Sequence, residues 1–196
     1  TFASTVGREY AMGRPLDLYC HSMGGGIGAA VLERYPNLFD KAVLSAPMIA
    51  PAVGMPTWVA RIVVGGICAL GFGKSRVFGH ADFSDNLNLD DYRGASEARI
   101  RWFHKQRLAD ECCWTNAATF EWANQAMALS RAVLKPDMCG AIETPTLLFQ
   151  AGLDVWVLNG PQDEFVERVR EGGGSIEKVR YDQSLHEIFS MPNDVV

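Results

Sequence analysis

The stretch LDLYCHSMGGGIGAAVLERYP, residues 16–36, decides the fold of this chain. Its first five residues read as a short buried strand, and a glycine-rich turn then leads into a helix that Pro36 ends. A serine, Ser22, occupies the turn itself. A serine at a sharp turn between a buried strand and a helix is typical of a nucleophile elbow, which exposes the serine hydroxyl.

The residues around Ser22 fit such a turn, with one departure. Because the backbones crowd together at an elbow, the neighbouring positions must be small, and Gly24 meets that need. Cys20 stands where the G-x-S-x-G pattern has its first glycine. The positive end of the following helix points at the turn, so the backbone N–H of Met23 is the expected oxyanion-hole donor. A dinucleotide-binding loop is the rival interpretation, but the spacing here is G-x-G-x-G rather than G-x-G-x-x-G.

Further strands are predicted at residues 42–45, 146–150 and 176–181, and a helix is predicted from Pro161 to about residue 171. Strands that alternate with helices indicate a parallel sheet with helices packed on its faces. The fold class is therefore α/β.

Residues 48–142 interrupt this alternation, because their periodicity is helical and they show no convincing strand pattern. Helices are predicted over residues 58–70, 96–108 and 117–134. We therefore expect a core formed by residues 1–47 and 143–196, and a helical cap formed by residues 48–142.

Asp154 and His186 each follow a predicted strand. Asp154 lies two residues after Gly152, as expected of an acid that orients a histidine. Its nearest rival, Asp163, falls inside a predicted helix. His186 follows the last strand, where a general base can reach the serine.

The chain has three other histidines, and none of them fits the role of the base. We expect His21 to point away from the site, because neighbouring side chains in an elbow diverge. His80 and His104 lie in the helical insertion. The carboxyl ends of parallel strands meet at one edge of a sheet, so Ser22, Asp154 and His186 are predicted to form a catalytic triad.

Composition excludes several classes of protein. The chain has 196 residues, 48% of them hydrophobic, and a net charge of −5, which fits one domain and gives no reason to expect a nucleic-acid partner. Its five cysteines form no pair of C-x-x-C units, so no zinc site is expected and a reducing, cytoplasmic location is favoured. The apolar run over residues 58–72 is shorter than the roughly 20 residues of a spanning helix, which leaves open a peripheral membrane contact.

With these residues in place, the chain resembles the monoacylglycerol lipase and bacterial lysophospholipase branch of the α/β-hydrolases. The segments that carry the resemblance are HSMGGGIGAAVLERYP (21–36), KAVLSAPMIAP (41–51), MPTWVARIV (55–63), TPTLLFQAGLDVWV (144–157) and LHEIF (185–189). The resemblance implies Ser22 as nucleophile, Asp154 as acid, His186 as base and Met23 as oxyanion donor. The N-terminal strands of that fold, with the loop for the second oxyanion donor, have no counterpart in this chain.

The expected activity is hydrolysis of lysophospholipids or monoacylglycerols through an acyl-enzyme, with no metal or organic cofactor. The apolar insertion is expected to line a pocket for the acyl chain through Trp58, Ile62, Ile67 and Phe72. Two alternatives stay open. A serine aminopeptidase would need an acid for the substrate's amine, such as Asp82 or Glu121, and a non-catalytic binding protein is also compatible with the fold.

Overall fold

The computed structural model describes residues 2–79 and 82–196. The chain divides into two compact units. The first comprises Thr1–Ala52 with Ala128–His186, and the second comprises Val53–Met127 with Glu187–Val196. The division into core and cap at residues 48 and 142 stays a prediction.

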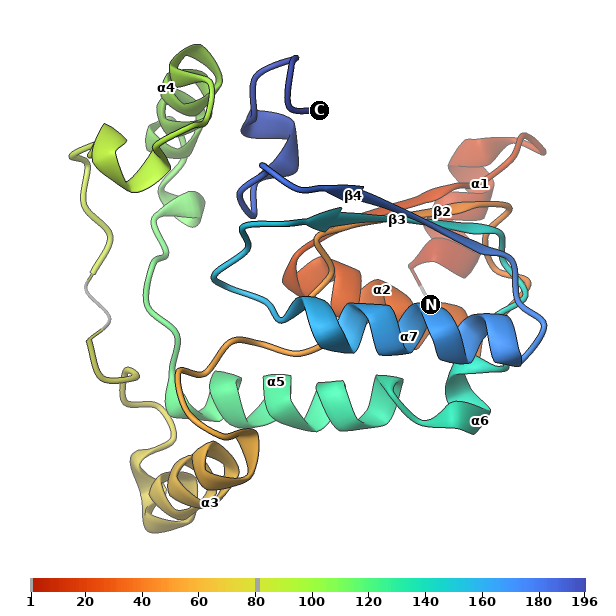
Figure 1. Cartoon of the computed structure of the whole chain (residues 1–196), viewed down its shortest axis with the longest axis horizontal. Helices are drawn as coiled ribbons and strands as arrows, with labels where there is room; N and C mark the ends of the chain where they lie inside the picture. The colour runs from red at the N-terminus through yellow and green to blue at the C-terminus, as the bar shows by residue number, and fades with distance from the viewer. Residues whose placement is uncertain (1, 80–81) are drawn as a thin grey trace. The chain divides into compact units, whose positions relative to one another are not determined.

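The first unit is built on a four-stranded parallel sheet (Figure 1). Its strands, in spatial as well as chain order, are β1 (Leu18–His21), β2 (Ala42–Ser45), β3 (Thr146–Ala151) and β4 (Ile176–Tyr181). Ala42 pairs with both Leu18 and Thr146, and Thr146 pairs with Ile176. The strands therefore start at one level, and all four carboxyl ends point to the same edge. The predicted strands and the parallel arrangement are confirmed.

Two helices connect neighbouring strands of this sheet. Helix α2 (Met23–Arg34) joins β1 to β2, and α7 (Asn159–Glu171) joins β3 to β4. Because the strand order follows the chain and parallel crossovers are right-handed, both helices must fall on the same face of the sheet. Figure 1 shows them there. The other helical segments wholly within this unit are η1 (Ala3–Gly7), α1 (Arg8–Ala11) and α6 (Pro136–Cys139).

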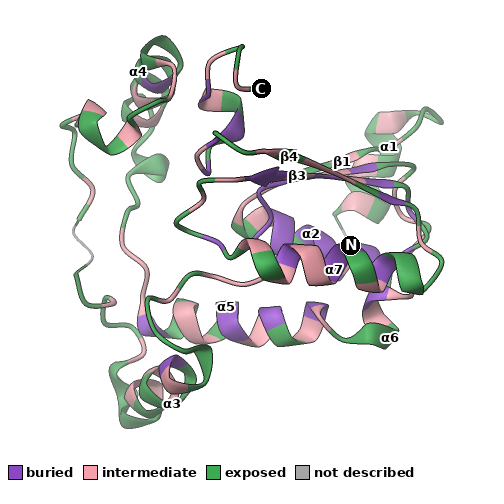
Figure 2. Cartoon of the chain, in the orientation of Figure 1, coloured by how far each residue is buried: buried purple, intermediate pink, exposed green. Residues whose placement is uncertain are grey.

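The core lies between the sheet and these two helices. Leu32 of α2, Leu44 of β2, Leu148 of β3 and Phe165 of α7 have no exposed surface. Figure 2 shows buried stretches on both α2 and α7. Burying a side chain of this size contributes roughly 1.5–3 kcal/mol to stability, so this apolar layer holds α2 and α7 against the strands. The opposite face of the sheet is less buried, and Tyr19 of β1 is 55% exposed.

Helix α2 packs closely on its neighbours because it begins with glycines. A Cβ added to Gly26 would lie 2.4 Å from the carbonyl oxygen of Met48, and one added to Gly28 would lie 2.8 Å from Sγ of Cys20. A Cβ on Gly24 would meet nothing within 4 Å among the described residues. A Cβ on Gly25 would lie 2.6 Å from Cα of Pro47, so the positions that require glycine are Gly25, Gly26 and Gly28 rather than Gly24. Cys20 fits where glycine is usual because Gly28 faces it.

The described part of the second unit contains no strand of the sheet, in agreement with the helical periodicity of residues 48–142. Its helical segments are α3 (Thr57–Ile67), η2 (Cys68–Phe72), η3 (Leu89–Tyr92), α4 (Glu97–Leu108), η4 (Glu111–Cys113) and η5 (Ile188–Ser190). Helix α5 (Phe120–Val133) belongs to this unit up to Met127 and to the first unit from Ala128 onward. An isolated bridge joins Arg76 to Thr119.

The contact between Cys20 and Gly28 predicts a specific coupling. Alanine usually stabilises a helix interior by about 1 kcal/mol relative to glycine. Gly28→Ala should nevertheless lower the free energy of unfolding by about 1–3 kcal/mol, because the new methyl group overlaps the Cys20 sulfur. Adding Cys20→Gly should recover much of the loss. Thermal unfolding measures both effects.

Gly24→Ala is the matched control in the same helix, and it should be neutral or stabilising because nothing faces it. Strictly additive effects of Cys20→Gly and Gly28→Ala would contradict the proposed packing of α2 on β1.

Candidate active site

Ser22 lies between the last residue of β1 and the first residue of α2, in a strained backbone conformation. Its φ is 53° and its ψ is −121°. A non-glycine residue in such a region costs of order 1–3 kcal/mol and persists only where its surroundings hold it. The backbone N–H of Ser22 donates to the carbonyl of Ser45 at 3.1 Å, and its carbonyl accepts from the N–H of Met48 at 2.8 Å. The end of β2 therefore holds the turn in place.

The side chain of Ser22 is hydrogen-bonded to His186, which is hydrogen-bonded in turn to Asp154. Nε2 of His186 lies 2.8 Å from Oγ of Ser22, and Nδ1 of His186 lies 2.7 Å from Oδ2 of Asp154. A carboxylate can only accept, so Nδ1 carries a proton and Nε2 of the neutral ring accepts the serine hydroxyl proton. The structure thus brings together three residues that the sequence places far apart. It orders them as a nucleophile, a base and an orienting acid would have to be ordered.

Asp154 is held rigidly as the acceptor. Its side chain has no exposed surface. Oδ1 accepts the backbone N–H groups of Trp156 at 2.8 Å and Val157 at 3.1 Å, which leaves Oδ2 directed at His186. The two backbone hydrogen bonds to Oδ1 and the hydrogen bond between Oδ2 and His186 leave the carboxylate little freedom to rotate.

Backbone contacts join the loop that carries Asp154 to the loop that carries His186. The N–H of Gly152 donates to the carbonyl of Tyr181, and the N–H of Leu153 donates to that of Ser184, each at 2.9 Å. A Cβ on Gly152 would lie 2.4 Å from the carbonyl oxygen of Asp182. Glycine at this position is therefore required for the two loops to approach each other.

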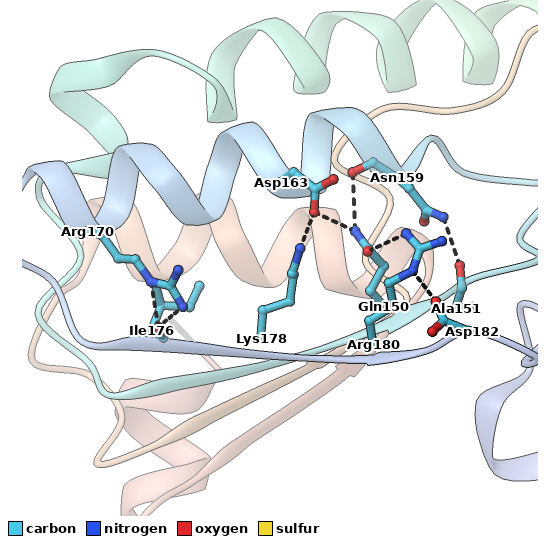
Figure 3. A network of polar contacts seen from close by, with 9 residues as sticks. All are labelled: Gln150, Ala151, Asn159, Asp163, Arg170, Ile176, Lys178, Arg180 and Asp182. Atoms are coloured by element: carbon cyan, nitrogen blue, oxygen red, sulfur yellow. Dashed lines mark hydrogen bonds and ion pairs between the residues drawn. The ribbon is translucent and has the colours of Figure 1, made fainter. Parts of the chain in front are cut away.

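Asp163, the rival acid, takes part in a different network. It pairs with Lys178 and accepts from Nε2 of Gln150 at 2.9 Å (Figure 3). Partial burial raises the pKa of Asp163, but the hydrogen bonds from Lys178 and Gln150, together with the positive charges of Lys178 and Arg180, hold the pKa below its ordinary value. Asp163 is thus a structural anion that ties α7 to β3 and β4.

The prediction that His21 points away from the site is wrong. Its ring centroid lies 5.0 Å from that of His186, with the two ring planes tilted by 49°. The imidazole is directed at the neighbouring strand, where Nδ1 lies 3.1 Å from the carbonyl oxygen of Ser45. His104 is bonded to the carbonyl of Asp85 in the second unit, and His80 lies outside the described residues.

Met23 is the first residue of α2, so its backbone N–H lies at the positive end of the helix next to Ser22.

Two side chains of a kind that can bind metal ions also lie close together here, since ring nitrogens of His21 and His186 lie within 4.8 Å of one another. Both nitrogens of His186 are already bonded to Ser22 and Asp154. A cation bound by His186 would therefore have to break one of these hydrogen bonds.

The four residues predicted to bind the acyl chain lie in the second unit. Trp58 and Ile62 of α3 and Phe72 of η2 are exposed, and Ile67 is half-buried. Their role in binding substrate stays a prediction.

The chain is similar in sequence to lysophospholipase L2 of Escherichia coli. For strain K12 it is 28% identical over 169 residues, which covers 82% of this chain and 47% of the relative. The chain therefore spans about half the length of the curated relatives it matches.

The fold is similar to that of solved lipases. The monoacylglycerol lipase of Paleococcus ferrophilus matches 96% of this chain and 66% of its own, with a TM-score of 0.62 and 16% identity. A soluble variant of the monoglyceride lipase of Saccharomyces cerevisiae, solved with a substrate analogue, matches 97% of this chain and 60% of its own, with a TM-score of 0.64 and 18% identity.

The profile of the serine aminopeptidase S33 family matches residues 1–193, which is nearly the whole chain. The parallel sheet and the strand-to-helix turn at Ser22 agree with that match. This chain therefore belongs to the serine aminopeptidase S33 family and has the α/β-hydrolase fold.

Proposed function

We propose that this chain is the catalytic part of a serine hydrolase that cleaves carboxylic esters of lysophospholipids or monoacylglycerols. The observation that carries the proposal is the unbroken hydrogen-bond chain from Ser22 through His186 to Asp154, with lengths of 2.8 and 2.7 Å. The names of its relatives, a lysophospholipase and two monoacylglycerol lipases, support the choice of lipid esters. The mechanism requires neither a metal nor an organic cofactor.

In the first half of the reaction, Oγ of Ser22 attacks the carbonyl carbon of the ester while its proton moves to Nε2 of His186. The tetrahedral intermediate then breaks the bond to the alcohol oxygen, and His186 returns the proton to that oxygen. The products of this half are a free alcohol, such as glycerol or a glycerophosphate, and an acyl group on Ser22.

In the second half, water attacks the acyl carbon and gives a proton to His186. The bond to Oγ of Ser22 breaks, the proton returns to that oxygen, and a fatty acid leaves. Asp154 holds the same tautomer of His186 throughout and stabilises the imidazolium that forms twice in each cycle. The buried, doubly anchored carboxylate of Asp154 suits this task.

The oxyanion of each tetrahedral intermediate needs hydrogen-bond donors directed at it. We assign the backbone N–H of Met23 as one of them, because it lies at the start of α2 beside Ser22.

A serine aminopeptidase is the second candidate, favoured by the description of the family to which the chain belongs. Such an enzyme needs an acid for the substrate's free amine. Of the two acids predicted for that role, Asp82 is exposed and pairs with Arg76, and Glu121 is an exposed residue of α5. Neither is a buried carboxylate, which favours the ester substrate. A non-catalytic binding protein is a third reading, and it would not need the ordered hydrogen bonds of the triad.

The exposed face of α3 and η2 is suited to a lipid surface. Trp58 and Ile62, one helical turn apart, are 66% and 67% exposed, and Leu70 and Phe72 are 76% and 60% exposed. An apolar face turned toward water is unusual on a helix and often marks a binding surface. No helix in the described ranges is long and apolar enough to cross a bilayer. We therefore propose that this face, which we call the α3 surface, lies in the interface of a membrane or lipid aggregate.

The segment of the sequence that contains the α3 surface carries basic residues and no acidic ones. No Asp or Glu occurs between Asp40 and Asp82, whereas Arg61 lies within α3 and Lys74 follows η2. Basic residues beside an apolar helix face add attraction to anionic headgroups.

The cytoplasmic location stays a prediction. All five cysteines are free thiols, which is consistent with it.

The two aspartates give a test of the triad. Asp154→Asn should lower kcat by orders of magnitude, since the comparable change in a serine protease costs about 10⁴-fold. Asp163→Asn should leave kcat nearly unchanged and lower only thermal stability, because Asp163 serves the network with Lys178. Ester hydrolysis by the full-length protein measures both. A larger loss of kcat in Asp163→Asn would show that the wrong acid has been assigned.

A substrate comparison separates the candidate functions. We expect a monoacylglycerol and a lysophospholipid to be hydrolysed with much higher kcat/KM than aminoacyl anilides of similar size. The reverse order would identify an aminopeptidase. No turnover of either class by the full-length protein, together with no labelling by a fluorophosphonate, would favour a binding protein.

The α3 surface gives the third test. Trp58→Ser and Ile62→Ser should each lower kcat/KM for long-chain esters by about tenfold or more, because each removes apolar contact worth roughly 1.5–3 kcal/mol. Acetate esters should be hydrolysed within about twofold of the wild-type rate, and binding to phosphatidylglycerol vesicles should weaken. Trp102→Ser, which alters a tryptophan of α4 with 64% exposure, is the matched control and should change neither quantity. Equal losses on long and short esters would contradict a lipid-binding role.

A further inference from the structure

His21 is held in a fixed position beside the triad. It is the last residue of β1 and pairs in register with Ser45, the last residue of β2. Its Nδ1 lies 3.1 Å from the carbonyl oxygen of Ser45. Because a carbonyl can only accept, Nδ1 must carry the proton in this bond, and the bond fixes the orientation of the ring.

The same carbonyl oxygen also holds the backbone of the nucleophile. The N–H of Ser22 donates to the oxygen of Ser45 at 3.1 Å, beside the bond from His21. A carbonyl oxygen has two lone pairs and can accept both bonds. The end of β2 thus sets the position of Ser22 and of the His21 ring together.

The ring of His21 lies against that of His186. The centroids are 5.0 Å apart with a 49° tilt, a spacing typical of packed aromatic rings. The two nitrogens of His186 are bonded to Asp154 and Ser22, and only 8% of the residue is exposed. The two hydrogen bonds fix the positions of the nitrogens in the ring plane, but they restrict the tilt of the ring less strongly. Packing by a neighbouring ring restricts that motion.

We infer that His21 is a positioning residue that holds the His186 ring in the plane where Nε2 faces both Ser22 and the leaving alcohol. This inference rests on the proposed function, because it assigns His21 a part in the reaction of the same triad. His21 contacts the base rather than the reacting atoms, so its effect is on orientation. Misplacing a catalytic group by about 1 Å can cost 10²-fold in rate.

Substitutions at position 21 distinguish the effect of ring packing on His186 from the effect of the hydrogen bond to Ser45. His21→Ala removes both, His21→Gln keeps a donor that can reach Ser45, and His21→Phe keeps a ring but no donor. We expect His21→Ala and His21→Gln to lower kcat by about 10- to 100-fold with KM within about twofold of the wild-type value. His21→Phe should recover most of kcat. The measurement is steady-state hydrolysis of a soluble ester by the full-length protein.

Proton NMR gives a second measurement, which reports on the ring of His186 directly. The proton shared by Nδ1 of His186 and Asp154 should give a low-field proton NMR signal in the wild-type protein and in His21→Phe. The signal should broaden or vanish in His21→Ala, because the ring gains freedom. His104→Ala is the matched control, since it removes a histidine of α4 in the other unit, and it should alter neither kcat nor the signal.

Comparison with Ser22→Ala separates a failure of the positioning role of His21 from a failure of the proposed function. If His21→Ala and His21→Gln keep the wild-type kcat while Ser22→Ala is inactive, the positioning role is wrong and the proposed function stands. If His21→Phe folds with an unchanged melting temperature but is as slow as His21→Ala, ring packing is not the cause. If Ser22→Ala keeps its activity, the proposed function itself fails.

Discussion

The arrangement of the site depends on the strained peptide at Ser22. A φ of 53° and a ψ of −121° are unfavourable for serine, and the turn keeps them because its backbone is bonded to the last residue of β2 and to the segment just after it. The N–H donates to Ser45 and the carbonyl accepts from Met48. Those bonds require β2 to lie beside β1 in parallel register, so the geometry of the nucleophile is a consequence of the sheet.

The rest of the site follows from the same parallel sheet. Because all four strands run in one direction, the segments after β1, β3 and β4 leave the sheet at one edge and carry Ser22, Asp154 and His186 to it. Close approach of backbones then sets the distances. Gly26 lets α2 pass against Met48, and Gly152 lets the loop after β3 touch the loop after β4. A side chain at either glycine would separate the elements that carry the triad.

The sequence predicts the strands, the principal helices and the triad, because each depends on local pattern and on the order of elements along the chain. It does not predict the contacts made across strands. The elbow pattern places a small residue at Gly24, whereas the close contacts fall at Gly25, Gly26 and Gly28, since they depend on how α2 crosses its neighbours. The divergence of neighbouring side chains in an elbow concerns the direction of Cβ, so it does not predict where the ring of His21 lies. The position of its ring depends on a carbonyl of β2, and no pattern in residues 42–48 marks that oxygen as an acceptor of two bonds.

The central claim is that Ser22 is the nucleophile. Its most direct test is to treat the full-length protein briefly with a fluorophosphonate and to locate the modified residue by peptide mass spectrometry. In the proposed mechanism His186 and Asp154 activate this hydroxyl, so we expect rapid modification of Ser22 alone, abolished by Ser22→Ala. Rapid modification that persists in Ser22→Ala, or that maps to another serine in the wild-type protein, would contradict it.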